Sequence, residues 1–257
     1  MNRIITTLFT IFIIQLLVVN KTLGNDGEVK DCFEKLNRVT FALNMGLDKV
    51  VFKPISKGYR KLPSPIRSGT SNALNNLSNL ITIPNNILQG DFGSAANNSA
   101  RLIINTTLGI AGIFDPANSF GFEKREKEDF GQSLGVMGVG EGCYLVLPVL
   151  GPSTVRDTVG SLIAMNGGDV WHNITVRDDE EYVKEFKESD YWVSRVTSGI
   201  DFRAKNLEAF DAMEKNSIDL YATVRSLYLQ DRKKKINNSS DKTEAMEDGD
   251  WDTLENQ

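Results

Sequence analysis

The chain has 257 residues, of which 40% are hydrophobic and 25% are charged, and its formal net charge at pH 7 is −5. This length and composition are typical of a globular protein with one large domain or two small ones. The acidic balance argues against a nucleic-acid-binding protein, which would carry a basic surface.

The first 24 residues have the pattern of a secretory signal peptide. Arg3 precedes an apolar run from Ile4 to Val19, and Thr22-Leu23-Gly24 supplies small residues at the cleavage position. The run is short for a membrane helix, and an uncleaved anchor is the alternative. We therefore expect an exported protein whose first 24 residues are removed.

Residues 31–53 predict an amphipathic helix or a pair of helices. A mostly apolar stripe recurs there at spacings of three and four, through Phe33, Leu36, Thr40, Leu43, Leu47 and Val50. Asn44-Met45-Gly46 interrupts the stripe and predicts a bend. Lys53-Pro54 predicts the start of a new segment, because the residue before a proline disfavours the helical conformation.

The next elements are also helical. Leucines at 74, 77 and 80 predict a helix whose other face carries Asn72, Asn75, Asn76 and Asn79. A separate short element is expected after Pro84, from Asn85 to Gln89, with Gly90 at its C-terminal end. A further helix from Ser94 to Thr107 leads into an apolar stretch, Leu102 to Phe114. That stretch is too short to span a bilayer and too apolar for a surface helix in water, so it is predicted to lie in the core or to face lipid.

Glycines crowd the segment from 131 to 160, which predicts sharp turns and close approach of the backbone. The best strand candidate is Tyr144 to Val149, although Pro148 interrupts it. Beyond it, an exposed helix is expected from Asp179, and Ile200 to Lys235 is the longest helical region, with a break at Asn216-Ser217. The sequence therefore predicts a mainly α fold, with one helical domain over residues 25–235 and a disordered acidic tail over 236–257.

The glycine-rich segment has features of three chemical motifs. A phosphate-binding Walker loop fails because Glu141, not lysine, follows Gly140, and a dinucleotide fingerprint fails because Cys143 stands at the third glycine position. The nucleophile-elbow pattern of serine hydrolases does match Gly131 to Gly135, with Ser133 at its centre. Asp157, Asp169 and the single histidine, His172, follow in hydrolase order. The charged residues before Gly131 argue against the elbow, and the alternative for Ser133 is a small polar turn residue.

The two cysteines, Cys32 and Cys143, could form a disulfide in an oxidising compartment or remain as two buried thiols. With one histidine and two distant cysteines there is no cluster with zinc-ligand spacing. We expect neither a metal site nor a cofactor.

A set of ordered motifs between Asp31 and Arg232 resembles the MlaA/VacJ family. The similar segments are Leu36-Asn37-Arg38, Leu47-Asp48, Lys53-Pro54, Tyr59-Arg60, Pro65-Ile66-Arg67, Asn85 to Gly90, Arg101 to Gly109, Asp129 to Gln132, Leu147 to Pro152 with Arg156-Asp157, and more weakly Ser217 to Gln230. The ordered set is far more specific than any single motif.

The resemblance implies a ring-like bundle of amphipathic helices embedded in one leaflet of the Gram-negative outer membrane, with a central amphipathic channel. Members remove mislocalised phospholipids from the outer leaflet and pass them to a periplasmic carrier of the Mla type, working beside a porin trimer. The resemblance carries over no catalytic residue and therefore implies that the protein is not an enzyme.

Two site hypotheses follow from the resemblance. The lipid channel is expected to be lined by Gly135, Gly138, Gly140, Gly142, Tyr144, Leu147, Pro148 and Leu150. The alternative is that these glycines only make tight turns in a packed core. The bend at Asn44, Met45 and Gly46 is expected to gate the channel, and its alternative is a plain helical hairpin turn.

The sequence departs from the family in two places. Members are commonly lipoproteins, but Asn25 follows Gly24 where a lipobox needs cysteine, so we expect no lipid anchor. Attachment to the periplasmic leaflet of the outer membrane would then rest on apolar rim contacts or on the porin. Cys143 stands where the family usually has proline. The alternatives to lipid transport are a secreted esterase or phospholipase that uses Ser133, and a passive lipid-binding scaffold of the envelope.

Overall fold

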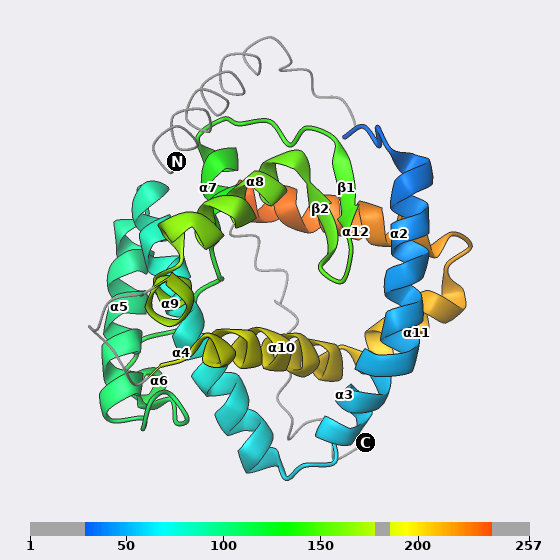
Figure 1. Ribbon diagram of the computed structural model, residues 1–257. Coiled ribbons are helices and arrows are strands. Elements are labelled where there is room, and N and C mark those ends of the chain that lie inside the picture. Colours follow the sequence, from blue (N-terminus) through cyan, green and yellow to red (C-terminus); the bar gives the residue numbers. More distant parts are fainter. Residues whose placement is uncertain (1–28, 178–185, 238–257) are drawn as a thin grey trace.

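The structure is a computed structural model that describes residues 29–177 and 186–237 (Figure 1). The expected signal peptide, residues 1–24, lies outside the described residues. The same holds for the expected acidic tail from residue 238 onward.

The helices are arranged in a ring (Figure 1). One side is formed by α2 (Glu34–Leu47) and α3 (Lys53–Tyr59), and the opposite side by α4 (Ser64–Leu88) and α5 (Phe92–Thr107). Helix α10 (Glu188–Lys205) joins these two sides. A hairpin, α7 (Phe130–Val136) and α8 (Val155–Ile163) complete the ring, and α12 (Leu220–Ile236) passes behind the hairpin. The prediction of a mainly α fold is confirmed.

Shorter elements connect these helices. They are α6 (Pro116–Ser119), α9 (Val170–His172), α11 (Leu207–Asn216) and the π-helical segments Asp48–Phe52, Ala164–Gly168 and Asn173–Arg177. The expected break at Asn216-Ser217 is confirmed, since α11 ends at Asn216. Of the helix expected from Asp179, residues 178–185 lie outside the described part, Phe186 and Lys187 are not helical, and the helix begins at Glu188.

The hairpin pairs β1 (Tyr144–Leu147) with β2 (Gly151–Thr154) in antiparallel register, Tyr144 opposite Thr154 and Leu147 opposite Gly151. The strand expected at Tyr144 is confirmed. Its partner was not predicted, because Gly-Pro-Ser-Thr contains few strand-forming residues. Behind the hairpin, Tyr144, Val146 and Tyr221 form a small buried cluster with Phe41 and Tyr228.

The bend predicted at Asn44-Met45-Gly46 is wrong. Helix α2 runs without interruption to Leu47, and only then does the backbone loosen into a π-helical segment. Asn44 does not break the helix because its side chain bonds to another element and does not compete for its own backbone. Gly46 costs the helix only about 1 kcal/mol relative to alanine.

The separate element predicted after Pro84 is also wrong. Helix α4 continues through Pro84 to Leu88, and Gly90 follows with a φ of +78°. The buried side chains of Asn85 and Asn86 bond to Ser133 and Asn98 on neighbouring helices. These contacts stabilise the helical turn that the proline weakens. The expectation of a terminating glycine at Gly90 is confirmed.

The distribution of polar and apolar side chains is inverted relative to a water-soluble protein. Many buried side chains are polar, among them Asn37, Thr82, Asn85, Asn86, Asn98, Asn105 and Gln132. Large apolar side chains are exposed on most sides of the ring, among them Leu36, Val39, Leu43, Val50, Ile87, Phe92, Ile103, Val193 and Phe202. Within residues 29–177 and 186–237, no helix is both long enough and apolar enough to cross a bilayer.

The apolar stretch Leu102 to Phe114 follows this pattern. Ile110 is 62% exposed and Phe114 is 59% exposed, in a loop where Ile110 and Ala111 have positive φ values of 53° and 54°. Of the two environments expected for this stretch, these side chains therefore do not lie in the core.

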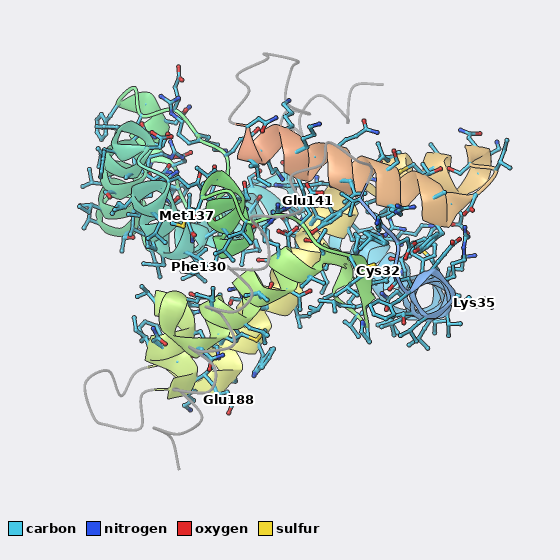
Figure 2. All side chains as sticks on the ribbon, turned by 90° about the horizontal axis from the view of Figure 1, so that it is seen from above. Cys32, Lys35, Phe130, Met137, Glu141 and Glu188 are labelled. Carbon is cyan, nitrogen blue, oxygen red and sulfur yellow. A yellow bond between two sulfur atoms is a disulfide. The ribbon has the colours of Figure 1, made fainter. Side chains whose placement is uncertain are left out.

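A disulfide joins Cys32, just before α2, to Cys143, just before β1, with the two Cα atoms 5.6 Å apart (Figure 2). It closes a loop across 111 positions of sequence. A cross-link over so long a loop restricts the unfolded chain strongly.

We expect the disulfide to contribute about 2–4 kcal/mol to the free energy of unfolding. Reductant should lower the thermal midpoint of the wild type to that of a Cys32→Ser/Cys143→Ser variant and leave the variant unchanged. Detection of two free thiols in the unreduced, denatured wild type would contradict the pairing.

Candidate functional site

Helix α2 holds the hairpin through two asparagines. Their side-chain amides bond to backbone groups of the hairpin as the backbone of a neighbouring strand would. Asn37 donates from Nδ2 to the carbonyl of Tyr144 (3.0 Å) and accepts from the amide of Val146 (2.9 Å). Asn44 donates to the carbonyl of Leu147 (2.9 Å) and accepts from the amide of Val149 (2.8 Å).

The spacing explains why both asparagines reach the same edge. Seven helical residues span about 10.5 Å, and three strand residues span about 10 Å. Asn37 and Asn44, two turns apart on α2, therefore reach carbonyls that are three residues apart on the hairpin, those of Tyr144 and Leu147. Because the edge groups of β1 are satisfied by side chains, α2 and the hairpin are held in fixed register.

The N-terminal segment is tied to the same assembly. The amide of Tyr144 donates to the carbonyl of Lys30, and Asp31 accepts from Asn37 and from the Tyr221 hydroxyl. Arg225 of α12 donates to the carbonyl of Val29. The disulfide thus reinforces a junction that hydrogen bonds already define.

An apolar pocket lies between α2, the turn of the hairpin and the helices α10 to α12. Its volume is about 180 Å³. Its lining residues are Phe41, Asn44, Met45, Leu47, Asp48, Phe52, Val149, Gly151, Pro152, Arg203, Phe210, Met213, Glu214, Leu220 and Val224. Apolar side chains from α2, the π-helical segment Asp48–Phe52, α11, α12 and the hairpin turn make it suited to a hydrocarbon chain.

A buried ion pair forms the polar part of this pocket wall. Arg203 donates from Nε and Nη2 to the two carboxylate oxygens of Asp48, at 2.8 and 2.9 Å, and lies 4.8 Å from the ring centre of Phe210. The hydrogen bond to Asp48 raises the pKa of Arg203, which keeps the guanidinium charged. Its Nη1 is buried without a partner among the described residues. The ion pair is therefore the charged part of an otherwise apolar wall.

The predicted gate residues Asn44 and Met45 lie in the wall of this pocket, whereas Gly46 is exposed on the other side of α2. Val149, at the turn of the hairpin, faces the same pocket with a φ of +66°. This conformation is strained for a β-branched residue, and the bond from its amide to Asn44 holds it.

The residues predicted to line a channel are not brought together on one wall. Tyr144 is fully buried in the cluster behind the hairpin, and a Cβ on Gly135 would come within 2.7 Å of Ile236. Gly138, Gly140 and Gly142 lie in the connection between α7 and β1, and Gly138 and Gly142 have positive φ. Leu147, Pro148 and Leu150 belong to the hairpin, where Pro148 and Leu150 are exposed.

Sequence reasoning missed the wall supplied by α10 to α12. Phe210, Met213, Leu220 and Val224 line the pocket with Arg203. These four apolar residues recur with helical periodicity in the sequence, but periodicity alone does not distinguish a stripe that packs in a core from one that lines a pocket.

Ser133 lacks the geometry of a catalytic serine. It lies inside α7, is 2% exposed, and donates to Asn85 Oδ1 at 2.6 Å while accepting from Gln89. Asp169 pairs with Arg195, and the ring of His172 packs against Tyr191. The nucleophile elbow requires a strand before the serine, and residues 123–129 form none.

An ion network that is buried at Arg232 and Asp157 and partly exposed at Asp129 joins α7, α8 and α12. Arg232 donates to both carboxylate oxygens of Asp129, at 2.6 and 2.9 Å, and to Asp157 at 2.9 Å, and Tyr228 also donates to Asp157. Burial alone would raise the pKa of each carboxyl. For Asp129 the hydrogen bonds and charge of Arg232 outweigh burial and lower the pKa to about 2. For Asp157 the charges of Arg232 and Arg156 lower the pKa.

The helices of this network approach closely at two glycines. A Cβ at Gly160 would lie 2.3 Å from the backbone nitrogen of Gly131. Any larger residue at Gly160 would separate α7 from α8. The motifs Asp129 to Gln132 and Arg156-Asp157 are thus brought together as one structural clamp.

Fold and site together define a helical ring with a polar interior, an apolar outer surface and an apolar pocket. The family model described as MlaA lipoprotein matches residues 29–235. The chain therefore belongs to the MlaA lipoprotein family.

Individual relatives agree with this assignment. An uncharacterized protein of Rickettsia prowazekii is 34% identical over 200 residues, which cover 77% of this chain and 75% of the relative. The intermembrane phospholipid transport system lipoprotein MlaA of Escherichia coli is 32% identical over 221 residues, covering 84% and 82%. The corresponding protein of Haemophilus influenzae is 29% identical over 218 residues, covering 82% and 81%.

A solved structure has the same fold. It is described as the structural basis for maintenance of bacterial outer membrane lipid asymmetry, and it matches with a TM-score of 0.67 and 30% identity. The match covers 81% of this chain and all of that chain.

We predict that Asn44→Ala releases the hairpin turn without releasing β1. Amide exchange at Val149 should accelerate while exchange at Val146, held by Asn37, stays slow, and the protein should lose about 1–2 kcal/mol of stability. Asn166→Ala is the control, since the side chain of Asn166 bonds to the carbonyl of Leu162, four residues earlier, and attaches to no other described element. Equal acceleration at Val146 and Val149 would contradict separate attachment.

We predict that Arg232→Gln destabilises the fold by about 2 kcal/mol at pH 7, because it removes the cation that Asp129 and Asp157 share, while Asp157 keeps its bonds to Arg156 and Tyr228. The lowered pKa values mean that the carboxylates stabilise the wild type above about pH 3.9, and that this contribution is lost as the pH falls toward 2. The difference between wild type and variant should therefore shrink as the carboxylates become protonated.

Urea unfolding in micelles between pH 7 and pH 2.5 measures this difference. Lys233→Gln, an exposed neighbour on α12, is the control and should follow the wild type. A difference that is constant with pH would show that the clamp acts by packing alone.

Proposed function

We propose that this protein removes mislocalised phospholipids from the outer leaflet of the outer membrane and passes them to a periplasmic carrier, thereby maintaining lipid asymmetry. Two of its relatives are named as lipoproteins of an intermembrane phospholipid transport system. The observation that carries the proposal is the apolar outer surface of a ring that also contains an apolar pocket.

The apolar surface supports insertion into one leaflet. Along α2 and the π-helical segment Asp48–Phe52, Leu36, Val39, Leu43 and Val50 are all exposed, Val50 by 77%. Asn37 and Asn44 on the other face of α2 bond to the hairpin. Monomeric soluble proteins rarely expose contiguous apolar patches larger than a few hundred square ångströms. Amphipathic helices of this kind lie in the plane of a membrane interface with their apolar faces in lipid.

The pocket between α2, the hairpin and α10 to α12 is the proposed contact for a lipid tail. Phe41, Met213 and Val224 supply apolar contact, and Arg203 Nη1 supplies a donor for an ester or phosphate oxygen. Gly138, Gly140, Gly142, Leu147, Pro148 and Leu150 are proposed to border the same path, while Gly135 and Tyr144 support it from behind.

Asn44 and Met45 are proposed to act as the gate of this path, with Gly46 behind them. The structure suggests how a straight helix could gate. The two bonds of Asn44 fix the hairpin turn, whose Val149 forms part of the pocket wall. A change in these bonds would move the turn without bending α2.

The proposed partners are phospholipids, a porin trimer and a periplasmic carrier of the Mla type, and we expect no cofactor. Export is supported by the disulfide, which forms in oxidising compartments such as the periplasm. Attachment by apolar contacts, without a lipid anchor, is part of the proposal. We also propose that the protein is not an enzyme, which the hydrogen-bonded, buried Ser133 supports.

Deleting the gene should expose phospholipid at the cell surface and increase detergent sensitivity. Wild type and Ser133→Ala should both restore the barrier. Met213→Trp, which fills the pocket, should not restore it, whereas Met165→Trp on a π-helical segment outside the pocket should. Surface phospholipid is measured by outer-leaflet labelling, with equal protein levels in the membrane fraction as the condition for comparison.

The alternatives give different results. An intact barrier in the deletion strain would rule out lipid transport and favour a passive scaffold. Failure of Ser133→Ala alone, with labelling of Ser133 by a fluorophosphonate probe, would favour an esterase. Full restoration by Met213→Trp would remove the pocket from the lipid path.

A further inference from the structure

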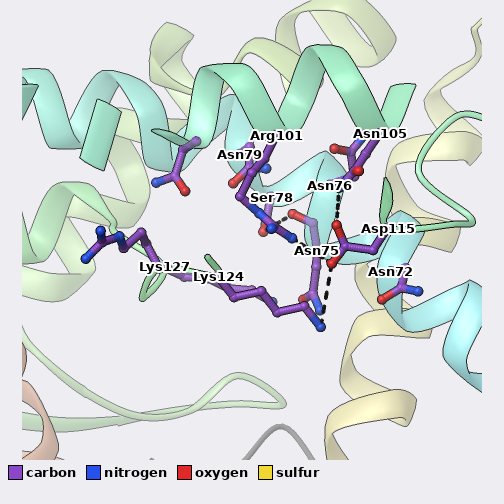
Figure 3. Close-up of a pocket in the computed structure, with 12 residues that line it drawn as sticks. Asn72, Asn75, Asn76, Ser78, Asn79, Arg101, Asn105, Asp115, Lys124 and Lys127 are labelled. Atoms are coloured by element: carbon purple, nitrogen blue, oxygen red, sulfur yellow. Dashed lines mark hydrogen bonds and ion pairs between the residues drawn. The ribbon is translucent and has the colours of Figure 1, made fainter. Parts of the chain in front are cut away.

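A second pocket, lined by polar and charged side chains, lies between α4, α5 and the segment that follows α5 (Figure 3). Its volume is about 60 Å³, enough for a small polar group but not for an acyl chain. Its lining residues are Asn72, Asn75, Asn76, Ser78, Asn79, Asn98, Arg101, Asn105, Asp115, Lys124, Arg125 and Lys127. None of them lines the apolar pocket described above.

Helical periodicity builds the two facing walls. Asparagines at 72, 75, 76 and 79 share one face of α4, and Asn98, Arg101 and Asn105 share one face of α5. Asn76, Asn98, Arg101 and Asn105 are all more than nine-tenths buried. A helix pair that needed only stability would bury apolar side chains here, because buried polar groups require partners.

One carboxylate organises the base of the pocket. Asp115 accepts from Arg101 Nη2 and from Asn105 Nδ2, both at 2.8 Å, and Asn105 also accepts from the amide of Ala117. In Figure 3 the side chain of Lys124 extends toward Asp115, and the two charged groups are 4.0 Å apart. Asp115 is therefore largely used by the protein's own groups.

The charge of the pocket is positive. Arg101, Lys124, Arg125 and Lys127 line it, against the single carboxylate of Asp115. Asn76 adds a second feature: its Nδ2 donates to Thr106, but its Oδ1 is buried without a partner among the described residues. Cations together with an unused acceptor suit a ligand that carries an anionic group and also a donor.

The pocket adjoins the exposed apolar loop that follows α5. Asn72 donates to the carbonyl of Ile113 (3.3 Å), and a Cβ on Gly112 would lie 2.6 Å from the side chain of Asn76. Ile110 and Phe114 of this loop are exposed. A polar, cationic site thus lies directly beside apolar side chains that point away from the protein.

We infer that this pocket binds the phosphate-bearing headgroup of a phospholipid whose tails lie along the loop Leu108 to Phe114. Lys124, Arg125 and Lys127 contact the phosphate, and Asn76 Oδ1 accepts from an ammonium or hydroxyl group of the headgroup. This inference rests on the proposed function, to which it adds a headgroup site outside the apolar pocket.

The test uses the full chain in dodecyl maltoside micelles, with calorimetric titration of dihexanoyl phosphatidylethanolamine and, separately, of inorganic phosphate. Lys124→Gln/Arg125→Gln should weaken binding of the short-chain lipid about tenfold. The matched control is Lys233→Gln/Lys234→Gln, which removes the same charge from α12 and should bind like the wild type. Asn76→Leu, a change of similar size that removes the acceptor, should also weaken binding, with an unchanged thermal midpoint as the check on folding.

Two results would overturn the inference. Lipid affinity that is unchanged in Lys124→Gln/Arg125→Gln would remove the headgroup site. Inorganic phosphate that binds as tightly as the lipid, with the same dependence on the variants, would assign the pocket to free phosphate.

Failure of this test does not bear on the deletion experiment. The proposed transport function fails only if loss of the gene leaves surface phospholipid unchanged, whichever ligand occupies this pocket.

Discussion

Hydrogen bonds from asparagine side chains hold the ring together where most proteins of this size use an apolar core. Asn37 and Asn44 attach the hairpin to α2, Asn85 attaches α7 to α4, and Asn86 bonds to Asn98 between α4 and α5. Each such bond contributes only about 1 kcal/mol net, but leaving a buried partner unsatisfied costs more. The packing of the helices therefore depends on the direction and spacing of these hydrogen bonds. A shift of one helix would leave several buried polar groups without partners.

This interior follows from the environment proposed for the outside. When the outer surface is covered by lipid, apolar side chains such as Val50 and Ile103 are best placed there, and polar side chains remain for the contacts between helices. The same choice leaves polar groups available to line sites within the ring. The asparagine-rich pocket between α4 and α5 is lined by side chains of this kind, and Arg203 and Asp48 supply the charged part of the otherwise apolar pocket.

The sequence was informative where a pattern has one physical meaning. The apolar stripe of α2, the asparagine face of α4 and the break at Asn216 all appear in the structure. The sequence was misleading at Gly46 and Pro84. Local preferences predict a break there, but tertiary hydrogen bonds of nearby asparagines keep both segments helical. The sequence did not decide whether Cys32 and Cys143 pair, because it does not show that the segment before α2 lies beside the start of β1. The wall formed by Phe210 and Met213 could not be predicted either, because periodicity does not show which neighbour a stripe faces.

The contacts at the start of the described chain also constrain the order of folding. Val29, Asp31 and Arg38 bond to Arg225, Tyr221 and Asp219, at sequence separations of 196, 190 and 181. Helix α2 thus cannot make these contacts before α12 has been synthesised. The ring stays open until nearly the whole domain is complete. Closing so long a loop is slow and costs chain entropy. Until the ring closes, the apolar side chains lie on an incompletely folded chain, which is prone to aggregation. The protein therefore needs a membrane or a chaperone early in its biogenesis.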